Sequence, residues 1–244
     1  CDVDRNILEE RAAEVEKEHD QKPQLYDDFR KLLENKDIDA VIIGTPDHWH
    51  APMAIYALEN GIHAYLEKPM THTIEETYRL REAARKSKAL LMVGHQHRQT
   101  LSFQTAQDII EKGILGHVSL IQTNTNRNDD NGAWNYDIHD QANENTIDWD
   151  LFLGSAPKIP FNKNHFFRWR KWWAYGSGLS GDLLTHDYDR LNCVLNMGIP
   201  NSVMASGGVY THNDGRNVPD VLQVNMEFSD FSTDAVTQIG VNAG

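Results

Sequence analysis

Residues 40–94 carry the pattern that most limits how this chain can fold, because short apolar runs alternate there with helical stretches. The apolar runs occupy 40–44, 62–66 and 90–94, and continuous runs of this length are typical of strands covered on both faces. A helical pattern follows the first run and ends at Asn60-Gly61, while Thr73 and Glu76 predict a capping box at the next helix. Alternation of this kind predicts right-handed crossovers and a parallel sheet.

The sequence before residue 40 extends this organisation. Two further helices are predicted over 7–18 and 26–33. The chain begins with Cys1-Asp2-Val3-Asp4, which resembles the end of a strand without its beginning. We therefore expect an α/β protein with a Rossmann-like parallel sheet whose first strand is missing, and a chain that is truncated at both ends.

A different pattern follows Arg98. A helix is predicted over 103–112, a strand over 116–125 and a polar loop over 126–148, and a further helix opens near Asp182. Strand-like runs then follow one another with no helix between them, at 202–211, 221–228 and 233–241. This order predicts an α+β domain with a largely antiparallel, open sheet and the Asp182 helix against one face. We place the domain boundary near residue 97, which divides the chain into 1–97 and 98–244.

Composition excludes several classes of protein. A net charge of −13 argues against a surface that follows nucleic-acid phosphates. No apolar run approaches the roughly 20 residues that a membrane span needs. The two cysteines, Cys1 and Cys193, are too few for a disulfide framework and lack the spacing of a metal site. Because the N-terminus is expected to be missing, periplasmic and cytoplasmic locations both stay open.

Asp182 and His186 form the first candidate for chemistry. If the helix is regular, residues four apart lie on one face, so the carboxylate and the imidazole point the same way. A carboxylate beside an imidazole is the smallest general-base unit. The same two residues also fit a capping acid and a surface or core histidine, and the pair alone does not decide between these interpretations.

Polar residues follow three of the predicted parallel strands. They are 45–50, 67–69 and 95–98, and Asp2 ends the truncated strand. In open parallel sheets ligands bind at the carboxyl ends of the strands. An acid at the position of Asp2 is where a dinucleotide-binding fold holds the ribose hydroxyls.

Four motifs give the chain a resemblance to the glucose–fructose oxidoreductase, inositol dehydrogenase and rhizopine-catabolism family, known as Gfo/Idh/MocA. They are Thr45-Pro46 with His50, the run Glu67-Lys68-Pro69, Trp149-Asp150 through Leu153-Gly154, and Asp182 with His186. Their order and spacing agree along nearly the whole chain. What departs from the family is the missing first strand with its Gly-x-Gly-x-x-Gly turn, without which the pyrophosphate could not be held in the usual way.

The resemblance implies a catalytic set of Lys68, Asp182 and His186. Lys68 would position the nicotinamide and the substrate hydroxyl, His186 would take the hydroxyl proton, and Asp182 would orient the substrate or support His186. Residues implied at the cofactor are Asp2, Thr45, Pro46, His50, Glu67, Lys68 and Gln96. Residues implied at the substrate are Lys68, Arg98, Trp172, Asp182 and His186. Trp173 and Arg168 also precede the glycine-rich turn. For these side chains, stacking on a sugar and a role in an interface or core are equally open. Asp189, one turn beyond His186, is a further candidate for the surroundings of the site.

The implied activity is hydride transfer between NAD(P) and a sugar or cyclitol. The implied domains are a nucleotide-binding domain over 1–97 and a substrate-binding and oligomerisation domain over 98–244. Asp2 favours NAD over NADP, since a carboxylate would repel a 2′-phosphate, although NADP stays possible. A homo-oligomer, as a dimer or tetramer, is expected from the resemblance alone.

Other interpretations stay in view. Gly176 to Gly181 fits Gly-x-Gly-x-x-Gly literally, but no buried strand precedes it and no strand-ending acid follows it. The pairs His48-x-His50 and His95-x-His97 follow apolar strands, as ligands do in some metal-dependent hydrolases. Some relatives of the same fold are NAD-dependent glycosidases that act by transient oxidation and elimination. A member that has lost catalysis and serves in binding or assembly is the remaining alternative.

Overall fold

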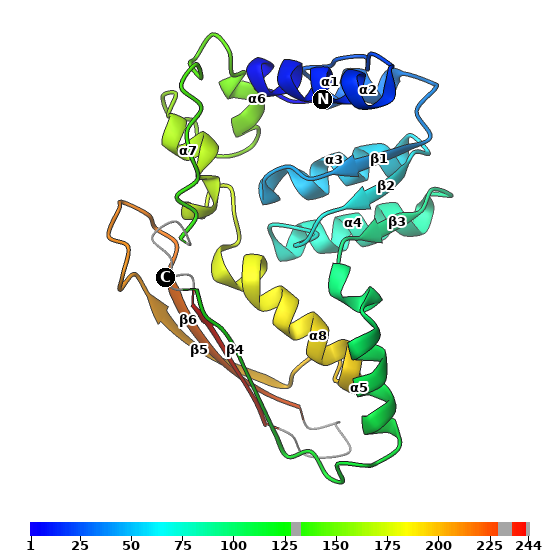
Figure 1. Cartoon of the computed structure of the whole chain (residues 1–244), viewed down its shortest axis with the longest axis vertical. Coiled ribbons are helices and arrows are strands. Elements are labelled where there is room, and N and C mark those ends of the chain that lie inside the picture. Colours follow the sequence, from blue (N-terminus) through cyan, green and yellow to red (C-terminus); the bar gives the residue numbers. More distant parts are fainter. Residues whose placement is uncertain (128–132, 229–235, 243–244) are drawn as a thin grey trace. The chain divides into compact units, whose positions relative to one another are not determined.

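The computed structural model describes residues 1–127, 133–228 and 236–242, the last range through its backbone alone. The chain divides into two compact units (Figure 1). The N-terminal unit contains Cys1–Val93 and Tyr136–Trp169, and the C-terminal unit contains Gly94–Asn135 and Arg170–Gly244. This division differs from a single boundary near residue 97, because the segment Tyr136–Trp169 returns to the first unit.

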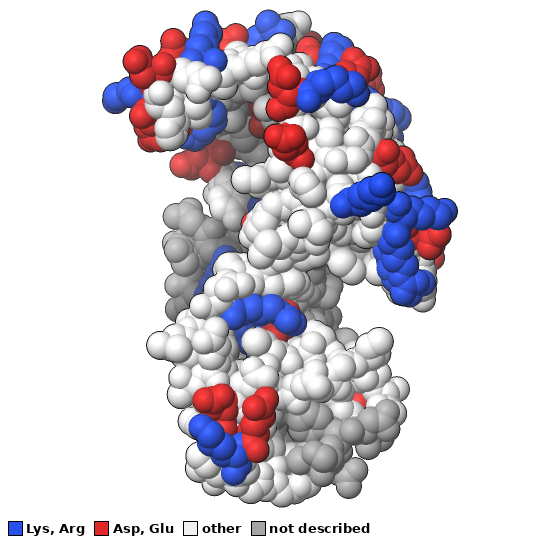
Figure 2. Space-filling view, turned by 90° about the vertical axis from the view of Figure 1, so that its right-hand side faces the viewer, with Lys and Arg blue, Asp and Glu red and all other residues white. Residues whose placement is uncertain are grey.

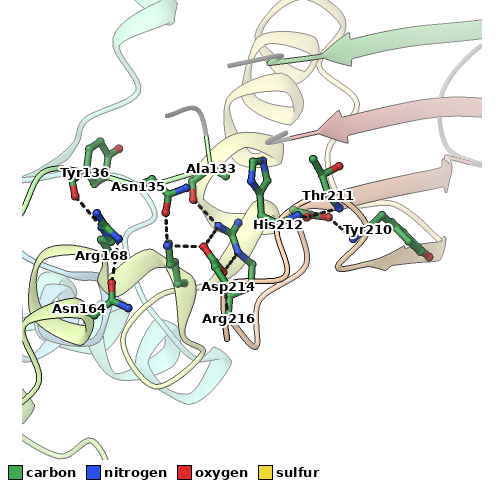
Figure 3. Close-up of polar contacts among 12 residues, drawn as sticks. Ala133, Asn135, Tyr136, Asn164, Arg168, Tyr210, Thr211, His212, Asp214 and Arg216 are labelled. Carbon is green, nitrogen blue, oxygen red and sulfur yellow. Dashed lines mark hydrogen bonds and ion pairs between the residues drawn. The ribbon is translucent and has the colours of Figure 1, made fainter. Parts of the chain in front are cut away.

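Long-range backbone contacts hold that segment in the N-terminal unit. Arg5 N donates to Thr146 O at 2.9 Å, and Asp148 N donates to Val3 O at 2.9 Å. The two ends of the segment also meet, since Arg168 Nε donates to Tyr136 O at 2.7 Å (Figure 3). Such contacts follow from folding rather than from local sequence pattern, so periodicity does not predict them.

The N-terminal unit has a three-stranded parallel sheet, as the sequence predicts, and its strand order is β1-β2-β3. Its strands are β1 (Ala40–Ile43), β2 (His63–Leu66) and β3 (Leu91–Val93). Its helices are α1 (Arg5–His19), α2 (Phe29–Glu34), α3 (Asp47–Glu59), α4 (Ile74–Lys86), α6 (Trp149–Leu153) and α7 (Lys163–Phe167). The predicted capping box is present, because Thr73 Oγ1 accepts from Glu76 N and the Glu76 carboxylate accepts from Thr73 N.

Helices α3 and α4 cover one face of this sheet. Ala54, Ala57, Leu58 and Leu80 pack there with inward strand residues such as Leu66. On the other face Ile42 is 82% exposed and Met92 is 54% exposed. Both are in register with Tyr65 of β2, so they form one apolar row across the sheet.

The C-terminal unit is built on a four-stranded sheet in the order β4-β7-β6-β5. The strands are β4 (Leu120–Thr125), β5 (Ser202–Gly208), β6 (Val221–Glu227) and β7 (Val236–Asn242). The β5–β6 and β6–β7 pairs are antiparallel, whereas β4 pairs with β7 in parallel. The expected largely antiparallel open sheet is therefore confirmed.

The helices of this unit are α5 (Leu101–Glu111) and α8 (Thr185–Leu195), which lie side by side (Figure 1). Shorter turns are η1 (Gln96–Gln99), η2 (Trp169–Lys171), which begins in the N-terminal unit, and the π-helical turn η3 (Ser180–Leu184). Leu183 and Leu184 pack with Val224 and Met226 of the sheet, and Leu191 packs against the same cluster. The prediction that the Asp182 segment packs on one face of the sheet is confirmed.

Charged side chains of both signs lie beside one another on the face drawn in Figure 2. Along the helices, several charged residues pair at helical spacing, as in Arg11 with Glu14 and Lys86 with Glu82. Exposed pairs of this kind contribute little to stability. Within the described residues, no helix has the length and apolar character needed to cross a membrane.

Candidate functional site

His50 connects the turns that follow β1 and β2. Its Nε2 lies 2.7 Å from Thr45 O and its Nδ1 lies 2.6 Å from Pro69 O. The side chain is buried, and it is presented by the first turns of α3, which begins directly after Pro46. His50 therefore fixes the two turns relative to each other, which is a positioning role for the Thr45-Pro46 and Glu67-Lys68-Pro69 segments.

Lys68 follows the last residue pair of the β1–β2 ladder. Glu67 N donates to Ile43 O at 2.9 Å, which continues the strand pairing, and the Glu67 carboxylate accepts from Lys68 N at 3.3 Å. The Lys68–Pro69 peptide bond is cis. Lys68 is thus presented at the carboxyl end of β2, where ligands bind in open parallel sheets.

Asp2, Thr45 and Pro46 line one cavity of about 530 Å³ within the N-terminal unit. The cavity also extends along β1 and past the aromatic side chains of Phe29 and Trp49. Thr45 Oγ1 is buried and has no hydrogen-bond partner in the structure. Asp2 Oδ1 accepts from Asp4 N at 2.8 Å. An unsatisfied hydroxyl and a carboxylate that line the same cavity fit the hydroxyl groups of a ribose-bearing cofactor.

Burial raises the pKa of the Asp2 carboxyl, and the negative charge of Asp4 adds to this effect. A donor that approaches Asp2 would relieve this cost, since hydrogen bonds to the charged form of a carboxylate stabilise it. Asp2 and Thr45, which are predicted at the cofactor, therefore have side chains whose chemistry fits a cofactor-binding role.

Asp182 lies in the π-helical turn η3, and α8 begins three residues later at Thr185. Asp182 Oδ2 accepts from Trp134 Nε1 at 2.8 Å, and Oδ1 accepts from Arg170 Nε at 3.2 Å. The expectation that Asp182 and His186 lie one α-helical turn apart is wrong in this detail, because a π turn has a wider hydrogen-bond spacing than an α turn. The structure instead places each carboxylate oxygen against a donor from another segment.

A buried charge network holds the segments that carry these donors (Figure 3). Arg216 donates to both oxygens of Asp214, from Nε at 2.8 Å and from Nη2 at 2.7 Å. Lys171, which is 1% exposed, donates to Asp214 Oδ2 at 2.6 Å and also to the side chain of Asn135. Arg216 Nη2 donates to Ala133 O at 2.9 Å. The hydrogen bonds from Arg216, together with the two positive charges, hold the pKa of Asp214 well below its usual range.

This network flanks both donors to the Asp182 carboxylate. Trp134 lies between Ala133 and Asn135, and Arg170 directly precedes Lys171. The orientation of Asp182 is therefore set by three chain segments, around 134, 170 and 214.

Comparison with known proteins identifies the family of the chain. Residues 5–95 match the NAD-binding Rossmann fold of an oxidoreductase family, and residues 146–234 match the C-terminal alpha/beta domain of the same family. The chain belongs to the Gfo/Idh/MocA oxidoreductase family.

Similar proteins include a glycosyl hydrolase family 109 protein of Shewanella putrefaciens, which is 32% identical over 122 residues. That match covers 48% of this chain and 27% of the relative. Among solved structures, the WlbA dehydrogenase of Bordetella pertussis in complex with NADH and UDP-GlcNAcA has a TM-score of 0.71 at 20% identity, covering 100% of this chain and 61% of that one. Levoglucosan dehydrogenase in complex with NADH and L-sorbose has a TM-score of 0.69 at 24% identity, covering 96% and 55%. The chain thus spans little more than half the length of these solved structures.

The Gfo/Idh/MocA motifs are divided between the two units. The predicted cofactor residues from Asp2 to Lys68 belong to the N-terminal unit, whereas Gln96, Asp182 and His186 belong to the C-terminal unit. The structure brings together Asp2, Thr45 and Pro46 in one cavity and connects His50 to two turns. Their contact with a cofactor stays a prediction.

The residues predicted at the substrate differ in exposure. Trp172 is 8% exposed, whereas Trp173 is 45% exposed, so Trp173 offers the more accessible ring. Arg98 Nε donates to Asp189 Oδ1 at 2.7 Å, and this bond raises the pKa of the guanidinium. The substrate roles of Trp172 and Arg98 stay predictions.

The glycine-rich run 176–181 has a structural reason to contain glycine. Gly178 has φ of +62°, and a Cβ there would lie 2.6 Å from the ring of Trp173. The run leads into η3 rather than following a strand, which agrees with its rejection as a nucleotide-binding turn.

His48 and His50, both in α3, face backbone carbonyl oxygens. His48 Nε2 lies 2.8 Å from Phe152 O, and both ring nitrogens of His50 face carbonyl oxygens. Within the part of the chain that the structure describes, no group of three His, Cys, Asp or Glu side chains is placed to hold a metal ion.

Several residues that orient Asp182 were not predicted from the sequence. Trp134, Arg170 and the Lys171–Asp214–Arg216 network carry no motif, because most of their contacts join positions from 12 to 83 residues apart in the chain. A run of lysine and arginine beside tryptophan, as at 168–173, resembles an exposed basic segment in sequence although Lys171 is buried.

Proposed function

We propose that this protein transfers a hydride between NAD and a hydroxyl-bearing carbon of a sugar or cyclitol. One observation supports this most directly. Asp182 is oriented by Trp134 and Arg170 four residues before His186, in a chain whose two halves match the two domains of the Gfo/Idh/MocA family. A carboxylate with a fixed orientation and an imidazole in the same motif suit proton transfer from an alcohol.

His186 takes the proton of the substrate hydroxyl as the carbinol carbon becomes a carbonyl. Lys68 places a positive charge near the same oxygen and favours its alkoxide character. Asp182 orients the substrate or supports the charged imidazole. When bound, the nicotinamide supplies the acceptor for the hydride.

Asp2 and Thr45 would hold the cofactor through its hydroxyl groups. The cofactor is NAD rather than NADP, because the carboxylate of Asp2 would repel a 2′-phosphate. Measured affinities test this assignment: tighter binding of NADP than of NAD to the full-length protein would refute it.

Turnover of a panel of sugars and cyclitols, followed by formation of reduced cofactor, tests the proposed reaction. Replacement of His186 by Gln or of Lys68 by Met should lower kcat by roughly 10²–10⁴-fold. Suitable controls are His117→Gln and Lys158→Met, since these residues are exposed. Unchanged turnover in both site variants would overturn the assigned roles.

A glycosidase reaction is the second candidate, because the curated relatives that match this chain include glycosyl hydrolase family 109 proteins. Transient oxidation of a sugar hydroxyl, elimination of the aglycone and reduction of the product would use the same proton-transfer residues. Aryl glycosides with NAD distinguish the two reactions: aryl release without net formation of NADH favours the glycosidase, and net NADH formation favours the dehydrogenase.

A homo-oligomer also belongs to this proposal. On β5 the side chains of Val203 and Met204 are exposed, which leaves apolar surface on the sheet of the C-terminal unit. Such patches often mark interfaces. Light scattering of the full-length protein tests this, and a monomeric mass at micromolar concentration would contradict it.

A further inference from the structure

His97 lies directly beside the predicted base. The rings of His97 and His186 have centroids 5.4 Å apart at an interplanar angle of 84°, so they meet edge to face. His97 is presented by η1, which follows β3, and His186 belongs to the first turn of α8. The sequence marked His97 as a possible metal ligand, but the proposed reaction gives it no role.

Arg190 determines the protonation of the His97 ring. Arg190 Nη2 lies 2.6 Å from His97 Nε2. A guanidinium only donates hydrogen bonds, so Nε2 accepts with its lone pair and the ring proton is on Nδ1. Burial lowers the pKa of His97, and the charge of Arg190 lowers it further. Both effects keep the ring neutral.

Arg190 is in turn fixed by a buried acid. Its Nη1 donates to Asp187 Oδ1 at 3.0 Å, and Asp187 is buried. The second oxygen, Asp187 Oδ2, accepts from Thr125 Oγ1 at 2.8 Å at the end of β4. A continuous set of contacts therefore runs from β4 through α8 to the ring that touches His186.

A second set of contacts fixes the backbone that carries His97. Arg98 donates to Asp189 Oδ1 from Nε at 2.7 Å, and His95 Nδ1 lies 3.6 Å from Asp189 Oδ2. These contacts attach η1 to α8 on either side of His97. The ring of His97 thus has little freedom to turn away from His186.

We propose that His97 and Arg190 are positioning residues for His186, with Arg190 holding His97 as a neutral Nδ1–H ring whose contact fixes the orientation of the base. This rests on the proposed function, in which His186 takes the substrate proton. A base that is misplaced by about 1 Å can lose roughly 10²-fold in rate, so a fixed neighbouring ring has a measurable effect on turnover.

The first experiment uses His97→Gln, whose amide oxygen still accepts from Arg190 but which lacks the ring. In the full-length protein kcat should fall about 10- to 100-fold while KM changes little, because orientation of the base acts on the chemical step. His97→Phe keeps an aromatic ring but lacks the acceptor, so its kcat should lie between that of His97→Gln and that of the wild type. His117→Gln is the matched control, being an exposed histidine of the same unit. A kcat of His97→Gln equal to that of the control would overturn the proposal.

The second experiment tests Arg190 separately. Arg190→Lys keeps a positive charge near Asp187 and serves as the control for correct folding. Arg190→Gln removes that charge. The acid limb of the kcat/KM profile should move to higher pH by about half a unit in Arg190→Gln, because loss of a nearby positive charge raises the proton affinity of the two histidines. The double variant with His97→Gln should be no slower than the slower single variant, since both changes act through one contact. Additive losses would contradict a shared role.

A measurement without turnover separates failure of this inference from failure of the proposed function. Long-range ¹H–¹⁵N spectra should show His97 protonated at Nδ1 alone at neutral pH, and the His186 resonances should shift in Arg190→Gln but not in His117→Gln. An Nε2–H tautomer at His97, or unchanged His186 resonances, would refute the positioning role. If the spectra agree but the wild type oxidises no sugar or cyclitol, the proposed reaction fails and the geometry at His186 stands.

Discussion

Replacement of Asp214 by asparagine removes the carboxylate that Lys171 and Arg216 share. Asp214 accepts from Arg216 through both oxygens and from Lys171 at 2.6 Å. Asparagine has nearly the same shape but only one acceptor oxygen, and its amide donors would face two cations that also only donate. The Lys171 and Arg216 side chains are 1% and 0% exposed, so water does not replace the lost acceptor.

The expected loss follows from this burial. Removing one partner of a buried ion pair destabilises a protein by about 3–5 kcal/mol, because an uncompensated charge stays inside. The Asp214 side chain is 30% exposed, which favours the lower part of that range. We therefore expect Asp214→Asn to lower the free energy of unfolding by about 3 kcal/mol at pH 7.

The pH dependence has a definite sign. The pKa of Asp214 is lowered in the folded protein, chiefly by the hydrogen bonds from Arg216. Its stabilisation is therefore fully present above the ordinary aspartate pKa of about 3.9 and is lost as the pH falls through the lowered value. The difference between wild type and Asp214→Asn should be equal at pH 7 and pH 5, and should shrink only below about pH 4.

Urea unfolding followed by tryptophan fluorescence measures this difference. Asp150→Asn is the control, because its pair with Lys158 is exposed on both sides and should change stability by less than about 1 kcal/mol. Lys171→Met provides an ordering test: it leaves Asp214 and Arg216 as a balanced pair, so it should destabilise less than Asp214→Asn. A larger loss in Lys171→Met, or equal losses in Asp214→Asn and Asp150→Asn, would refute the charge argument.

Three smaller changes test other parts of the structure. Gly178→Ala should destabilise by about 2 kcal/mol more than Gly113→Ala in urea unfolding, because both have positive φ but only the Cβ at 178 meets a tryptophan ring, at 2.6 Å. Trp134→Phe keeps an aromatic ring of smaller size and loses the N–H donor to Asp182, so kcat should fall about 10- to 100-fold, and because Trp134 lies in the core the free energy of unfolding should also fall by about 1–3 kcal/mol. Thr73→Ala removes the helix cap and should cost about 1 kcal/mol, measured as a fall in melting temperature of about 2–4 °C.

The local elements of the N-terminal unit could be predicted from the sequence because their signals are local. The apolar runs at 40–44 and 62–66 became β1 and β2, and Thr73 with Glu76 formed its capping box. Helix α2 begins at Phe29 rather than at residue 26, because the Asp28 side chain accepts from Arg30 N and so marks the start of the helix. Helix boundaries depend on which polar side chain reaches the backbone, and several candidates were adjacent.

The return of Tyr136–Trp169 to the first unit could not be predicted in this way. The carbonyl oxygen of Phe152 accepts from Trp49 Nε1 at 2.8 Å and lies 2.8 Å from His48 Nε2, although both residues are more than 100 positions away in the chain. Helices α6 and α7 have five residues each, too few to show a helical period. The last strand of the C-terminal sheet along the chain was predicted over 233–241, and the structure describes its part from Val236 onward as β7, while 233–235 lie outside the described residues.

The candidate site shows the same division between local and long-range information. The spacing of Asp182 and His186 was visible in the sequence, but the π-helical turn that changes their relative direction was not. What orients Asp182 is a pair of donors at 134 and 170, and what holds those donors is a carboxylate at 214 that two buried cations share. The motif therefore names the groups proposed to react, whereas the geometry of Asp182 depends on charges that have no motif. Because the Asp182 carboxylate is held through both oxygens, its direction is set before any substrate arrives, and preorganisation of this kind is what electrostatic catalysis requires.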